Sequence, residues 1–109
     1  MPSACRSTPV VGDPTCHIST SAGPLTLAVV GTTGSIRFQK VTYDGSDVPG
    51  TPVDQITLQI KPGKTKLVIV YSFSDPDNGA GELREVCATH NVLDSIDAGN
   101  PAEEYNICA

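Results

Sequence analysis

The feature that most constrains this chain is an apolar residue at every second position in several short stretches. The clearest case is Ile56-Thr57-Leu58-Gln59-Ile60, where Ile and Leu alternate with Thr and Gln. Successive side chains of a β-strand point to opposite faces of a sheet, so this pattern predicts a strand with one buried face. The stretch 66–73 repeats the alternation, and Lys61-Pro62-Gly63-Lys64 between the two stretches is typical of a tight turn. We therefore expect residues 54–73 to form a β-hairpin.

Further stretches indicate more strands. Alternation predicts strands at 15–20, 25–30, 35–43, 83–89 and 105–108. Within 35–43 the apolar positions change parity after Phe38, which predicts a β-bulge near Lys40 because one extra residue exchanges the two faces. Gly31-Thr32-Thr33-Gly34 predicts a turn with both glycines at positive φ. The polar stretch 91–103 favours at most one helical turn, around Val92 to Ile96.

Length and composition point to one small domain. The chain has 109 residues with 10 Gly and 9 Pro, so many turns interrupt it and long helices are disfavoured. We expect a single β-sandwich domain over 1–109, with an irregular N-terminal segment at 1–14. The formal net charge of −5 lacks the basic character that nucleic-acid binding requires. No apolar run approaches the roughly 20 residues of a membrane-spanning helix, so membrane insertion is not expected.

The four cysteines predict two disulfides. Cys5, Cys16, Cys87 and Cys108 are even in number and include no C-x-x-C pair, which favours bridges over a zinc site. The local pairing 5–16 with 87–108 closes short loops and is preferred; the crossed pairing 16–87 with 5–108 remains an alternative. No apolar leader follows Met1, and we expect that one was removed from a secreted, extracellular or periplasmic protein. A cytosolic protein with free thiols is the other alternative.

The fold class that these patterns favour is all-β: an antiparallel β-sandwich of about seven strands, immunoglobulin-like in a loose sense. The crossed pairing would link two sheets through Cys16 and Cys87, as in immunoglobulin-type domains. The chain has no Trp between these cysteines, and Glu85 stands where those domains have a Tyr. The resemblance is therefore architectural, and no family is implied.

Two acidic loops are the candidate functional segments, because loops carry the function of such scaffolds. In the loop 44–52, Asp44 and Asp47 with the preceding Tyr43 are candidate ligand-binding residues. In the loop 75–82, Asp75-Pro76-Asp77-Asn78-Gly79 begins like a calcium loop, and its candidate metal ligands are Asp75, Asp77, Asn78 and Glu82. The EF-hand pattern then fails at Ala80 and Val86, so a calcium site would recruit Glu82 or acids from another loop, such as Asp44 or Asp47. The alternative is an ordinary turn made by Asp, Asn and Gly.

No catalytic motif is present. The chain has no G-x-S-x-G sequence, and Glu82 and Glu85 fall on opposite faces of their expected strand, which makes them a poor acid–base pair. We predict a non-catalytic extracellular module that binds through protein–protein contacts and needs no cofactor. Two alternatives are a calcium-assisted carbohydrate or ligand-binding module, with a surface glycan as partner, and a small secreted enzyme inhibitor that uses the loop 44–52.

One strand also suggests self-association. Residues 66–73 carry Leu67, Ile69 and Tyr71 on one face and Val68 and Val70 on the other. A strand that is apolar on both faces is either central in a packed sheet or part of an interface. This pattern predicts a homo-oligomer formed through strand 66–73.

Overall fold

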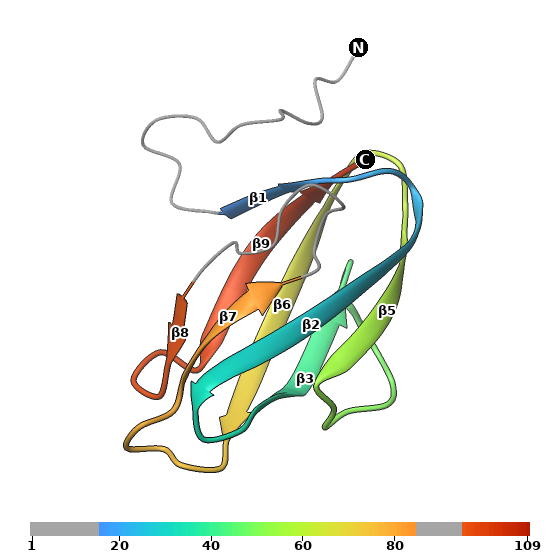
Figure 1. The fold of residues 1–109 in the computed structure, drawn as a ribbon. Helices are drawn as coiled ribbons and strands as arrows, with labels where there is room; N and C mark the ends of the chain where they lie inside the picture. The colour runs from blue at the N-terminus through green and yellow to red at the C-terminus, as the bar shows by residue number, and fades with distance from the viewer. Residues whose placement is uncertain (1–15, 85–94) are drawn as a thin grey trace.

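The chain folds into two packed β-sheets (Figure 1). The computed structural model describes residues 16–84 and 95–109. The five-stranded sheet has the order β1-β9-β6-β3-β4 and the four-stranded sheet the order β5-β2-β7-β8. The strands are β1 (Cys16–Ser19), β2 (Gly23–Thr33), β3 (Ile36–Tyr43), β4 (Ser46–Asp47), β5 (Gln55–Ile60), β6 (Lys64–Phe73), β7 (Ala80–Arg84), β8 (Ser95–Asp97) and β9 (Ala102–Cys108).

The all-β, sandwich-like class predicted from the alternation is confirmed, with two details corrected. There are more strands than the seven expected, and β1 pairs with β9 in parallel, so the larger sheet is mixed. Ser95 and Ile96, expected in a helical turn, belong to β8. The rest of that turn, the strand beyond Arg84 and the N-terminal segment 1–14 lie outside the described residues. No helix in the described ranges is long and apolar enough to span a membrane.

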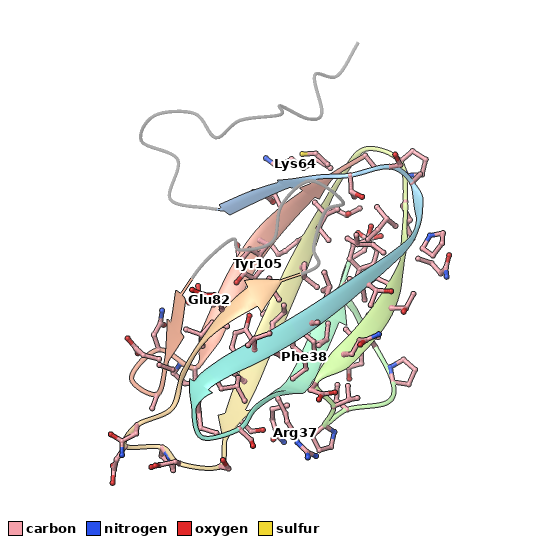
Figure 2. All side chains as sticks on the ribbon, viewed as in Figure 1. Arg37, Phe38, Lys64, Glu82 and Tyr105 are labelled. Atoms are coloured by element: carbon pink, nitrogen blue, oxygen red, sulfur yellow. The ribbon has the colours of Figure 1, made fainter. Side chains whose placement is uncertain are left out.

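One continuous core lies between the sheets. Phe38 and Tyr105 point into it from the five-stranded sheet and are fully buried, whereas Arg37 next to Phe38 points to solvent (Figure 2). Leu27 and Leu83 fill it from the opposite sheet. The alternating stretches 25–29, 36–43, 56–60 and 67–71 therefore bury the faces that their patterns predicted. Burial of this apolar surface is the main force holding the sheets together.

The predicted hairpin 54–73 is wrong. Strand β5 pairs with β2 in one sheet, whereas β6 pairs with β3 and β9 in the other. The Lys61–Gly63 segment crosses between the sheets, and Gly63, at φ +96°, joins the end of the chain through two backbone hydrogen bonds with Ala109 (2.8 and 3.0 Å). Alternation shows which face of a strand is buried, but both arrangements bury the same residues, so it could not distinguish a hairpin from a crossing.

The bulge prediction is confirmed, and the turn prediction is corrected in part. Pairing between β3 and β6 shifts register between Phe38 and Lys40, which puts Val41 and Tyr43 back on the buried face. Strand β2 runs on through Gly31 to Thr33, so the turn is shorter than expected and only Gly34 has positive φ, +68°. Gly31 is needed for space instead, since a Cβ there would lie 2.7 Å from the Gly34 carbonyl oxygen.

The predicted disulfides are not seen in the described residues. Cys108 is buried at the end of β9 and has no disulfide partner among the described residues. Cys5, Cys87 and the side chain of Cys16 lie outside what the structure describes. The parallel register places Cys16 opposite Tyr105, so Cys108 lies three residues, about 10 Å, further along. That separation excludes a direct bridge between Cys16 and Cys108 and leaves both favoured pairings open.

The two acidic loops lie at opposite ends of the sandwich. Tyr43, which precedes the first loop, is paired with Leu67 near the start of β6. The second loop begins after Phe73 at the end of β6, which is paired with Ile36. Six residues of strand, about 20 Å, separate these ends. The expectation that Asp44 or Asp47 would complete a calcium site in the loop 75–82 is therefore wrong.

Candidate binding groove beside strand β5

A groove of about 290 Å³ opens where the edges of the two sheets face each other. One wall is β5, the edge of the four-stranded sheet, and the other is β4 with the two residues after it, at the edge of the five-stranded sheet. The lining residues are Tyr43, Ser46, Asp47, Val48, Pro49, Thr57, Leu58, Gln59 and Lys61. Two of the three predicted ligand-binding residues, Tyr43 and Asp47, are thus brought together here, and the third, Asp44, is bonded to Lys61.

Tyr43 joins β3 to β6 and to the segment that follows β5. Its ring is buried, and its hydroxyl lies 2.6 Å from the Thr65 hydroxyl and accepts a 3.0 Å hydrogen bond from the Lys61 backbone N–H. These contacts join β3, β6 and the crossing segment. A buried hydroxyl with both partners in place fixes geometry more than it offers itself to a ligand. Tyr43 therefore contributes the apolar floor of the groove.

The rim carries charges that are already paired. A two-residue turn at Asp44-Gly45, with φ of +51° and +82°, joins β3 to β4 in the manner of a type I′ hairpin. It points Asp44 at Lys61, whose Nζ donates to the carboxylate at 2.7 Å. This hydrogen bond, and then the charge of Asp44, raise the pKa of Lys61 above its ordinary value. Asp47 lies 4.0 Å from Lys40. The rim thus has no unpaired charge for an ion.

The outer edge of β5 presents free backbone groups. The Val29 N–H donates to the Asp54 carbonyl at 3.1 Å, just before β5 begins. Residues of an antiparallel pair alternate between bonding their partner and pointing away from it. The backbone groups of Ile56, Leu58 and Ile60 therefore bond β2, and those of Gln55, Thr57 and Gln59 point outward. Within the described parts of the chain, no strand pairs with this outer side.

This edge differs from the other three edges of the sandwich. Strands β4, β8 and β1 have two, three and four residues, whereas β5 has six. Proteins usually protect edges by shortness, by charges, by proline or by bulges. Strand β5 contains no charge, no proline and no register shift. It is the longest and least protected edge of the described residues.

Of the predicted calcium residues, Asp75 and Asn78 contact each other, and Glu82 lies apart from them. Asp75 accepts hydrogen bonds from the side chain (3.3 Å) and backbone (3.2 Å) of Asn78, so these two residues close a turn. Glu82 lies on β7 opposite Val30, away from this turn, on the outer face of its sheet. Within 16–84 and 95–109, no three His, Cys, Asp or Glu side chains come together in a group that could hold a metal ion. Asp75 and Asn78 thus take part in a turn of the kind that Asp and Asn favour, and calcium binding by the loop 75–82 stays a prediction.

The outer face of β6 is the second predicted contact surface. The strand is central, between β3 and β9, so both of its edges are occupied. Val68 and Val70 are partly exposed on its outer face, beside an ion pair of Lys66 with Glu104 (3.4 Å). Being central in a sheet is one of the two explanations given for a strand apolar on both faces. An oligomer through this face stays a prediction.

The sequence reasoning missed Thr57, Leu58, Gln59 and Lys61 as members of the site. The available signal was the absence of charge and proline throughout 55–60, which becomes informative only once the strand is known to lie at an edge. Comparisons of the chain with protein-family models, curated proteins and solved structures gave no match.

Proposed function

We propose that this protein is a non-catalytic binding module that acts through protein–protein contacts at the outer edge of β5 and the adjoining groove. The observation that carries the proposal is the unprotected edge: Gln55, Thr57 and Gln59 direct backbone donors and acceptors outward along an uncharged strand. An extended segment of a partner can add to such an edge, with main-chain hydrogen bonds giving affinity and a side pocket giving selectivity. The groove beside Leu58 supplies that pocket.

Variants at the groove and at the opposite end test the proposal. Ser46→Trp fills the groove from its exposed wall, and Asp77→Lys changes the far loop by a comparably exposed residue. Immobilised wild-type protein should retain partner proteins from an extract of the source organism. Ser46→Trp should lose these partners, and Asp77→Lys should keep them. Loss of the partners with Asp77→Lys alone, or retention by both variants, would show that the contact surface lies elsewhere.

We also propose the finer fold relationship, an immunoglobulin-type arrangement. The order β9-β6-β3 with the β2–β5 pair in the facing sheet matches the G-F-C and B-E neighbours of that class, and the β5–β6 crossing matches its E–F crossing. The fold departs from that class in β7 and β8. These two strands follow β6 and precede β9 along the chain, and in space they extend the other sheet beside β2. This correspondence supports a scaffold on which edges and loops bind partners.

A secreted or periplasmic location with Cys5, Cys16, Cys87 and Cys108 in two disulfides is part of the same proposal. It rests on the number and spacing of the cysteines. Because Cys108 is buried, a native thiol assay would miss it even when it is free. Alkylation in denaturant without reductant, followed by intact mass, is the appropriate test. No added alkyl groups would support two bridges, and four would refute them.

A further inference from the structure

We propose that the occupant of the β5 edge is the β5 strand of a second copy of this chain, paired antiparallel about a two-fold axis at Thr57. This inference rests on the proposed function and names its partner. In that register Thr57 faces its own counterpart, and Gln55 faces Gln59 of the second copy. These are the residues whose backbone groups point away from β2, so the pairing provides partners for them from both strands.

The sequence of β5 is chemically symmetric about Thr57. Gln-Ile-Thr-Leu-Gln has the same type of residue at equal distances on either side of its centre. A two-fold interface uses one surface on both subunits, so it requires this kind of self-complementarity. Thr would face Thr, and Gln would face Gln, on the exposed side of the joined sheet. Hydroxyl and amide groups placed directly opposite each other can exchange hydrogen bonds.

Charge favours the antiparallel direction, with Lys61 also bonded to Asp44 of its own chain. Asp54 precedes β5 and Lys61 follows it. Antiparallel pairing brings the acidic end of one strand beside the basic end of the other. Parallel pairing would place acid beside acid and base beside base, which is unfavourable for closely spaced like charges.

The geometry around the edge leaves space for the added strand. The Ser46–Pro49 segment and β5 line a shared groove of about 290 Å³, and no strand of the described residues pairs with the outer side of β5. The rival surface, the outer face of β6, has both strand edges occupied and offers only Val68 and Val70 beside charged side chains. Joining two β5 edges would also remove the longest unprotected edge, which is how sheets avoid unwanted pairing.

A proline variant and an alanine variant of Thr57 test the backbone pairing. Thr57→Pro removes the outward N–H, whereas Thr57→Ala keeps it, and both lose the 3.0 Å contact between the Thr57 and Thr26 hydroxyls. Sedimentation velocity from about 1 µM to about 1 mM covers tight to marginal dimers. Wild type and Thr57→Ala should reach twice the mass of one chain as concentration rises, and Thr57→Pro should stay monomeric. A wild type that is monomeric throughout overturns the proposal.

A charge-pair rescue tests the register and remains informative if Thr57→Pro fails to fold. Gln55 and Gln59 are exposed, so charged residues there are compatible with the fold. The double variants Gln55→Lys/Gln59→Lys and Gln55→Glu/Gln59→Glu should each be monomeric, and an equimolar mixture should form a heterodimer. Self-association of either double variant at the wild-type concentration places the contact elsewhere and contradicts the proposal.

A peptide that copies residues 54–61 separates this inference from the proposed function. The labelled peptide should bind wild type, compete with dimer formation, and bind Thr57→Pro at least tenfold more weakly. If the peptide binds while the full chain stays monomeric at every concentration, the edge accepts strands but the second copy is not its partner. If the peptide does not bind and the full chain does not self-associate, both proposals fail.

Discussion

Strands β5 and β6 follow one another along the chain and alternate in the same way, yet they occupy opposite positions in the fold. Strand β6 lies between β3 and β9, and its core residues Leu67 and Ile69 are completely buried. Among the described strands β5 has a single neighbour, and its Ile56 remains slightly accessible, at 7 %. The comparison teaches that alternation identifies a buried face, whereas the number of neighbouring strands decides whether a strand stabilises the fold or remains free to bind.

The largest expected difference comes from deleting the same atoms in the two strands. Ile69→Ala removes a side chain that the core surrounds on all sides, and we expect a loss of about 4 kcal/mol in the free energy of unfolding. Ile56→Ala should cost about 2 kcal/mol, because the edge can relax into the vacated space. Urea unfolding of both variants measures the difference. Equal costs would show that the two strands are packed alike.

Proline at a position whose side chain faces away from the core gives the next largest difference in stability between the two strands. Val68→Pro removes a backbone hydrogen bond from a strand with neighbours on both sides, and it should cost about 3 kcal/mol. Thr57→Pro removes an N–H that points away from β2 and should cost under about 1 kcal/mol. Val68→Ala and Thr57→Ala are the controls for side-chain loss. A Thr57→Pro variant as unstable as Val68→Pro would mean that β5 is paired on both sides.

The hydroxyl of Tyr43 should contribute a smaller amount to the free energy of unfolding, through its contacts at the crossing between the two strands. Tyr43→Phe removes the hydroxyl that bonds Thr65 and leaves the Lys61 N–H without its acceptor, so we expect a loss of about 1 to 2 kcal/mol. Thr65→Val removes the same contact from the other side. A double-mutant cycle measured by thermal unfolding should give a coupling of about 1 kcal/mol between the two. Additive effects would indicate that the hydroxyls do not bond each other.

The smallest effect should come from the exposed ion pair at the crossing. Asp44 raises the pKa of Lys61 above its ordinary value of 10.5, so the folded state binds this proton more tightly than the unfolded chain does. The stabilisation is fully present below pH 10.5 and is lost as pH rises through the raised pKa. Lys61→Met should therefore destabilise slightly at neutral pH and low salt, with the difference from wild type disappearing at high pH or high salt. A difference that persists under both conditions would need another cause.

Local patterns predicted the strands and the bulge but not the partners of the strands. The parity change after Phe38 was enough to predict the bulge, because the burial of Val41 and Tyr43 requires it. The crossing at Lys61–Gly63 could not be predicted, since a hairpin and a crossing bury the same side chains. Tyr43 and Asp47 were named as site residues from the loop they flank, yet their neighbours on β5 depend on long-range contacts that no local pattern encodes.

Amide hydrogen exchange along β5, at a protein concentration where the chain is monomeric, tests the separation of β5 from β6 most directly. Exchange should alternate: fast at Gln55, Thr57 and Gln59, slow at Ile56, Leu58 and Ile60, and slow throughout the middle of β6. Uniform protection of all six amides of β5 would mean that a second strand covers its outer side, and the free edge on which this account depends would not exist.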